Sequence, residues 1–187
     1  MQIWEFSTDA NPAAPDVDEN PFGTAVATLY GLFDFPLRDT WWIDEDFGHL
    51  GVWNVGGAMG LEIPNHPELQ PLKLIRLQMT YDSGPSSPEI EPWIEVVASD
   101  GATVTDCQLV QMIALDDIYT HAVYDFTLAP NPHEEIIYIQ PRYCQIYIDE
   151  IVVDTICVPE PSSVLLLAVG AAGIAVLILR RRRRAGS

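Results

Sequence analysis

The sequence predicts an all-β body, folded as an antiparallel β-sandwich of the jelly-roll type, followed by one C-terminal transmembrane helix. Three observations lead to this fold class. Apolar and polar residues alternate over short segments, turn-forming residues recur about every dozen residues, and no helical period occurs before residue 164. We therefore expect residues 1–157 to form one sandwich domain and residues 158–187 to form a separate tail.

The first part of the body has a weak strand pattern. Residues 2–6 alternate and predict a strand, and residues 24–35 predict another with a turn at Gly31. Other segments are rich in proline, glycine or acidic residues, which favour turns over regular strands. They are expected to be loop, with one short strand in the last of them: residues 7–23, 38–46 and 48–61.

From residue 72 onward the alternation is regular. In residues 72–81 the side chains expected to point inward are those of Lys73, Ile75, Leu77, Met79 and Tyr81. Asp100-Gly101 is a hairpin turn signal, so we expect the segments on either side of it to pair. The predicted strands of this part are residues 72–81, 92–98, 103–113, 119–128, 135–140 and 143–154.

Charge divides the chain into an acidic body and a basic end. Residues 1–158 contain 26 of the 27 acidic residues and only four basic ones, a formal net charge of −22. A nucleic-acid partner is excluded because binding requires cationic groups that neutralise phosphates. Such a surface suits a soluble exported protein, or one that takes up divalent cations, and plain solubility is the favoured interpretation.

Calcium is the one cofactor considered. An EF-hand is excluded because Pro21 stands where its loop needs glycine and Ala27 stands where it needs a bidentate glutamate. A looser structural site remains an alternative. Its ligands would be Asp9, Asp16, Asp18 and Asp149.

Two adjacent tryptophans have two interpretations. Trp41 and Trp42 could stack on sugar rings, or they could cap one end of the core with each indole N–H hydrogen-bonded, which is the more frequent arrangement. His49 and His66 lack a partner at metal-ligand spacing and are expected to be loop histidines.

The cysteines and the catalytic motifs give little direction. Cys107, Cys144 and Cys157 show no zinc spacing; one pair could form a disulfide outside the cytoplasm, or all three could stay reduced. No serine-nucleophile elbow, zinc-protease or phosphate-loop motif occurs, and pairs of carboxylates carry no information in so acidic a chain. We expect a protein that is not an enzyme.

The last thirty residues have the clearest pattern. Residues 164–179 contain no polar side chain, and as a helix they would span about 24 Å, slightly less than a bilayer core. Five guanidinium groups resist transfer across a membrane and are expected to stay on its cytoplasmic side. These stop-transfer residues are Arg180, Arg181, Arg182, Arg183 and Arg184.

The order of features in this tail resembles a known sorting signal. Pro159, Glu160 and Pro161 precede the apolar run and the arginines, which is similar to the PEP-CTERM tail of bacterial exported proteins. The resemblance implies processing near the tripeptide by exosortase, a membrane protease-transpeptidase. The prolines also keep this backbone extended and block a helix from growing backwards over it, as a protease substrate requires.

One strand of the body carries a second resemblance. The segment 146–153, IYIDEIVV, is similar to the last strand of jelly-roll, galactose-binding-like domains. It favours a jelly roll over an immunoglobulin-like sandwich. This resemblance covers a single strand.

The two ends of the chain predict different cellular locations for the body. Residues 1–6 have neither the basic nor the apolar region of a signal peptide, yet a single C-terminal span with inside arginines requires an exported body. We expect a signal peptide to be missing from this sequence. Three hypotheses follow: an exported envelope or matrix protein, a carbohydrate-binding module of the cell surface, and a cytoplasmic tail-anchored protein.

Overall fold

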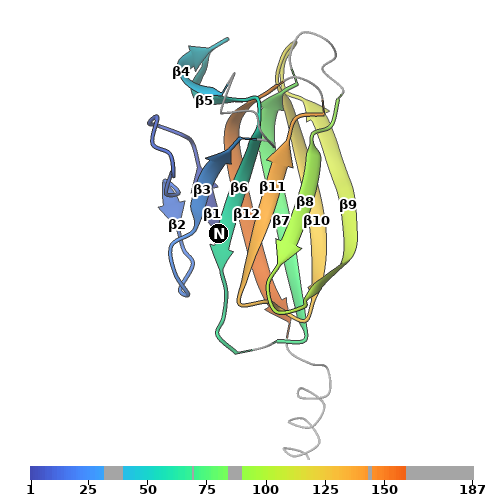
Figure 1. Cartoon of the computed structure of the whole chain (residues 1–187). Helices are drawn as coiled ribbons and strands as arrows, with labels where there is room; N and C mark the ends of the chain where they lie inside the picture. Colours follow the sequence, from blue (N-terminus) through green and yellow to red (C-terminus); the bar gives the residue numbers. More distant parts are fainter. Residues whose placement is uncertain (32–39, 69, 84–89, 143–144, 159–187) are drawn as a thin grey trace, which may run out of the picture.

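The computed structural model describes residues 1–31, 40–68, 70–83, 90–142 and 145–158. Within these ranges the chain is entirely β, with two antiparallel sheets, which confirms the predicted class (Figure 1). No helix in the described ranges is long and apolar enough to cross a membrane. The predicted span 164–179, the PEP tripeptide and the arginines lie outside those ranges.

The larger sheet has the order β2-β1-β12-β7-β10-β9, and β5 joins it by pairing with both β12 and β4. Its strands are β1 (Gln2–Trp4), β2 (Val17–Asp18), β4 (Trp41–Asp46), β5 (His49–Val55), β7 (Leu72–Asp82), β9 (Thr103–Ala114), β10 (Thr120–Ala129) and β12 (Ile146–Val158). The smaller sheet has the order β3-β6-β11-β8. Its strands are β3 (Val26–Tyr30), β6 (Ala58–Pro64), β8 (Trp93–Ala98) and β11 (Glu134–Gln140).

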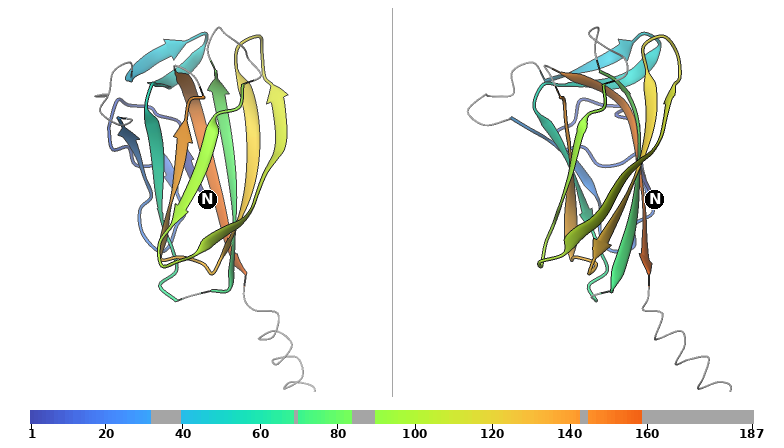
Figure 2. Two further views of the ribbon diagram at one scale, coloured as in Figure 1. Left: turned by 45° about the vertical axis from the view of Figure 1, so that its right-hand side comes forward. Right: turned by 90° about the vertical axis from the view of Figure 1, so that its right-hand side faces the viewer.

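The core lies between these two layers, which Figure 2 shows from two further sides. The inward face predicted for β7 is confirmed, because alternate side chains from Lys73 to Tyr81 are all buried. On β10 the inward set runs from Ala122 to Leu128 and is directly paired with it. Alternation with period two therefore identified the core face of both strands.

Two segments predicted as loops are largely strand. Residues 41–46 form β4, an edge strand that pairs only with β5; Asp44 and Glu45 are exposed, while Trp42 packs against the core. In 48–61, Gly51 within β5 and Gly57 in the β5–β6 turn permit close approach of neighbouring backbone. A Cβ on Gly51 would lie 2.4 Å from the Phe6 carbonyl oxygen, and one on Gly57 would lie 2.2 Å from that of Tyr30.

The predicted hairpin at Asp100-Gly101 is wrong in its pairing. The turn itself forms, with positive φ at both residues and a hydrogen bond from the Ala102 amide to the Ser99 carbonyl. However, β8 pairs with β11 and β9 pairs with β10, so the chain changes sheets at this turn. A two-residue turn fixes local geometry, while the choice of neighbour depends on residues distant in sequence.

A buried ion pair joins the two sheets. The Lys73 Nζ on β7 lies 2.5 Å from the Glu135 Oε1 on β11, and Asn65 hydrogen-bonds to both side chains. Both charged side chains are fully buried. Burial lowers the pKa of Lys73 and raises the pKa of Glu135, and the attraction between the two groups opposes both shifts.

This pair gives a prediction about stability. Glu135→Ala leaves the Lys73 ammonium buried without its carboxylate and is expected to lower the free energy of unfolding by about 3–5 kcal/mol. The double change Lys73→Met with Glu135→Leu removes both charges and should recover most of this loss. Urea unfolding followed by tryptophan fluorescence measures both. A loss below about 1 kcal/mol for Glu135→Ala would contradict this role.

Candidate functional site

The position of the sorting tail follows from the last strand. β12 stays paired with β7 up to its final residue, where Val158 lies opposite Leu72. This end of β12 lies at the opposite end of the sandwich from β4 and β5 (Figure 1). Strand pairing within the described ranges therefore extends to Val158, the residue directly before the predicted recognition tripeptide.

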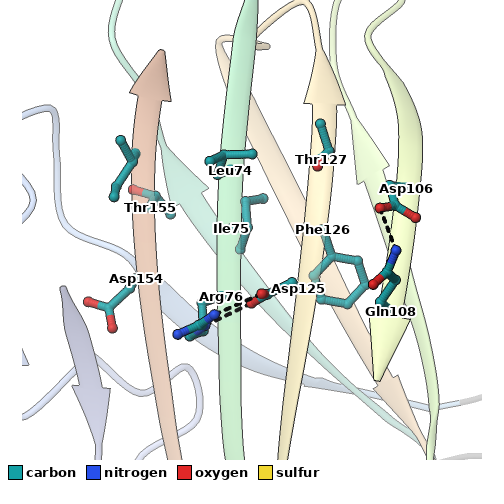
Figure 3. A pocket seen from close by; sticks show the side chains of 11 residues that line it. Leu74, Ile75, Arg76, Asp106, Gln108, Asp125, Phe126, Thr127, Asp154 and Thr155 are labelled. Atoms are coloured by element: carbon teal, nitrogen blue, oxygen red, sulfur yellow. Dashed lines mark hydrogen bonds and ion pairs between the residues drawn. The ribbon is translucent and has the colours of Figure 1, made fainter. Parts of the chain in front are cut away.

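The outer face of the larger sheet carries a groove with a volume of about 570 Å³ (Figure 3). Cross-strand register builds it. One row crosses four strands as Asp154, Arg76, Asp125 and Gln108. The neighbouring row crosses the same strands as Ile156, Leu74, Thr127 and Asp106.

A bidentate ion pair lies in the middle of the groove. The Arg76 guanidinium donates from Nε to Asp125 Oδ1 and from its terminal nitrogen to Asp125 Oδ2, both at 2.8 Å. This pairing lowers the pKa of Asp125 and raises that of Arg76. Asp106 accepts a hydrogen bond from Gln108 at 2.9 Å. The groove thus offers fixed carboxylates, an amide and one guanidinium beside the apolar side chains of its second row.

The end of the sandwich away from the tail contains a second cluster. The His49 Nδ1 lies 2.7 Å from Asp149 Oδ2, and its Nε2 lies 3.4 Å from Asp116 Oδ2. The imidazole stacks on the Tyr119 ring, with 3.8 Å between ring centroids. Tyr119 in turn donates its hydroxyl hydrogen to Asp46 at 2.8 Å. His49 is therefore a strand residue between two carboxylates, and its prediction as a loop histidine was wrong.

This cluster joins segments that are far apart in the chain. His49 begins β5, Asp116 and Tyr119 lie in the β9–β10 connection, and Asp149 lies on β12. Partial burial opposes the charged form of His49, but the hydrogen bonds and charges of its two carboxylates outweigh this effect and raise its pKa. Burial and the bond to Asp46 raise the pKa of Tyr119. No local motif could have identified the group, because its members are up to 100 residues apart.

The two predicted tryptophans have different environments. Trp42 packs against the core and donates its indole N–H to the Phe6 carbonyl at 2.9 Å, as the core interpretation requires. Trp41 is 46% exposed. Adjacent residues of a strand point to opposite faces, so the two rings do not form one shared platform.

The four carboxylates considered for calcium do not come together. Asp16 accepts hydrogen bonds from the Glu5 amide and the Ser7 hydroxyl, while Asp18 accepts one from the Asn20 amide. The Asp149 carboxylate is hydrogen-bonded to the His49 imidazole. Asp9 lies in an exposed loop. Within the described ranges no group of three or more histidine, cysteine, aspartate or glutamate side chains is placed to hold a metal ion.

The structure describes two of the three cysteines. Cys107 on β9 and Cys157 on β12 are free thiols, the first exposed and the second partly buried. Burial raises the pKa of both. Cys144 lies outside the described residues.

Comparison with known proteins supports the tail. The PEP-CTERM protein-sorting motif matches residues 158–184, which include the tripeptide, the apolar run and the arginines. Such a tail implies a membrane-anchored or exported protein that exosortase processes. No curated protein and no solved structure matches the chain, so the jelly-roll, galactose-binding-like resemblance of the body stays a prediction.

The His49 cluster predicts a pH dependence. Because folding raises the pKa of His49 above its ordinary value of 6.5, its contribution to stability is complete below that value and is lost as the pH rises through the raised pKa. Thermal unfolding between pH 5 and pH 9, about the range over which histidine titrates, should show this decline.

The variant His49→Gln tests the source of the dependence. It should remove this part of the pH profile and cost about 1.5–3 kcal/mol at low pH, the typical value of hydrogen bonds to charged groups. His66→Gln, at a half-buried position in the connection between β6 and β7, is the control for loss of a histidine elsewhere in the fold. An unchanged pH profile in His49→Gln would assign the dependence to other groups.

Proposed function

We propose that the chain is an exported protein of the cell envelope or extracellular matrix, released from its membrane tail by exosortase and without enzymatic activity of its own. The observation that carries this proposal is the position of the sorting motif, which begins at residue 158, the last residue of β12. In this proposal the sandwich is the exported product, and the tail is the sorting signal that is removed.

The strand order explains why cutting at the tripeptide would leave the sandwich folded. Every strand of the described sheets precedes Pro159, and the buried Lys73–Glu135 pair lies wholly within them. Removal of the tail also takes away the five consecutive arginines, while the body keeps its net charge of −22. The released product would be a strongly acidic and soluble domain.

Membrane topology is consistent with this direction of transport. Arginines after the apolar run favour a cytoplasmic C-terminus, which places residues 1–158 on the other side of the membrane. A tail-anchored protein with a cytoplasmic body would have to move five guanidinium groups outward. We therefore favour export over the cytoplasmic alternative.

The mature C-terminus tests the sorting proposal. Intact mass measurement on the protein from exosortase-containing cells should give a product that ends beside Glu160 and lacks residues 164–187. Deletion of exosortase, or Glu160→Ala, should leave the full chain in the membrane fraction. Glu95→Ala, on an exposed position of β8, is the matched control and should be processed normally. An uncut chain in the cytosol would overturn the proposal.

A second candidate, binding of an extracellular polysaccharide, is favoured by the groove on the larger sheet. Planar carboxylate, amide and guanidinium groups match sugar hydroxyls as hydrogen-bond acceptors and donors, and Leu74 and Ile156 lie beside them. The groove has no exposed aromatic ring among its lining residues. Binding there would therefore depend on hydrogen bonds more than on stacking.

A glycan array with and without calcium tests this candidate. For any polysaccharide bound, Asp125→Asn should weaken binding about tenfold or more, because it replaces a charged acceptor and releases Arg76. Asp44→Asn, on the exposed strand β4, is the matched control. Loss of binding in Trp41→Ala alone would move the site to the far end of the sandwich, and no binding to any glycan would remove this candidate.

A further inference from the structure

The strand β9 forms one edge of the larger sheet. It pairs with β10 on one side, and no strand of the described ranges pairs with it on the other. All twelve of its residues are exposed. Its outward N–H and C=O groups therefore form a long row that another strand could pair with.

This edge lacks the charges that usually protect such strands. Its only ionisable carboxylate is Asp106, and it contains no lysine, arginine or proline, although the body is strongly acidic. The other edges of the larger sheet are protected: β4 carries three carboxylates in six residues, and β2 has only two residues. The exposed apolar side chains of β9 are Val104, Leu109, Val110, Met112 and Ile113.

The core face of β9 is only partly covered. Register places Leu109 beside Tyr124 and Met112 beside Ala122, both of which point inward, yet Leu109 and Met112 remain 37% and 38% exposed. β8, the edge of the smaller sheet, borders the same flank (Figure 1). A hollow of about 270 Å³ lies between the two edges, and the buried Tyr124 hydroxyl beside it has no hydrogen-bond partner among the described residues.

We infer that β9 pairs antiparallel with β9 of a second copy of this chain. Pairing of an edge with its own copy about a two-fold axis satisfies both rows of backbone groups with one kind of surface. Both copies bring a nearly uncharged strand, so the acidic bodies can meet at the place where their repulsion is least. A cationic partner would instead be attracted to the acidic surface elsewhere on the body.

Two irregularities define where pairing can occur. The register between β9 and β10 shifts at Thr105 and at Val110, which leaves residues 106–109 and 111–114 as the regular stretches. Bulges shorten the straight part of an edge and limit its pairing. We therefore expect a closed dimer of modest affinity and not a continuing fibre.

The antiparallel arrangement has a consequence for location, which rests on the proposed function. β9 and β12 both run along the long axis of the sandwich (Figure 1), so a two-fold axis across β9 directs the two β12 ends to opposite ends of the dimer. Two copies held side by side in one membrane have their tails on the same side. The dimer is thus a property of copies released from the membrane, or held in separate micelles.

Sedimentation velocity on the full chain in detergent micelles, at about one chain per micelle, tests the pairing. The natural chain should dimerise with increasing concentration, and more strongly as salt screens the acidic bodies. Ile113→Glu places a charge on the edge and should weaken dimerisation about tenfold or more. Ile156→Glu, exposed on a central strand of the same sheet, is the matched control and should dimerise normally.

Two results would overturn the inference. One is a natural chain that stays monomeric at every concentration up to about 100 μM, a range that would show any dimer of useful affinity. The other is a dimer that Ile113→Glu leaves unchanged, since association would then come from another surface or from the tail.

Single-cysteine variants then identify the geometry. In a chain with all three native cysteines changed to serine, one cysteine is placed in turn at each position from 106 to 114, and diamide oxidises paired thiols to a disulfide while it is reduced to the hydrazine. An antiparallel two-fold pair gives cross-linking with a single maximum, and equal cross-linking at all positions or none would contradict it. These tests use the uncut chain, so they can fail independently of the sorting proposal.

Discussion

The pairing of β12 with β7 is the interaction on which the rest of the structure depends. β12 is the last strand in sequence, yet it lies inside the larger sheet and pairs with β1, β5 and β7. The N-terminal strand is therefore held in place by residues near the other end of the domain. The sheet can close only when the chain up to Val158 is present, and contacts so distant in sequence favour slow folding.

This dependence connects the fold to the tail. The same strand that closes the sandwich carries the chain to the residue at which the sorting motif begins. A body that completed itself with an earlier strand could tolerate a cut at many positions. Here a cut a few residues earlier would remove part of β12, while a cut at the tripeptide removes nothing that the described sheets use.

Charged residues are unevenly distributed over the domain. Among the described residues, one buried lysine–glutamate pair bridges the sheets, and β9 carries a single carboxylate although residues 1–158 have a formal net charge of −22. Such an excess of negative charge keeps copies apart in solution. In the proposed dimer, an edge with a single carboxylate would be a selective contact, because close approach elsewhere brings carboxylates together. The exposed Arg76–Asp125 pair marks the other place where charge is locally balanced.

Sequence patterns predicted the strands in which buried and exposed side chains alternate regularly. Alternation located β7, β8, β10 and β11 within a residue or two and identified the buried face that includes Lys73. It missed β4, whose sequence is dominated by carboxylates, and it placed only loop and one short strand in the region of β5, where Gly51 serves close packing.

Features made by distant residues were beyond the sequence. The exchange of partners after Asp100-Gly101 and the cluster around His49 depend on the sheet order. The groove likewise exists only because registers on four strands bring its rows together. The tail was the exception, since its order of tripeptide, apolar run and arginines is a linear signal.

Amide hydrogen exchange on the form recovered outside the cytoplasmic membrane tests most directly whether the sandwich and the tail are separable. Exchange through β12 up to Val158 should be slow and equal to that of the uncut chain. This form should also lack the residues from 164 onward. Rapid exchange along β12 in that form, or recovery of a form that still carries the arginines, would contradict it.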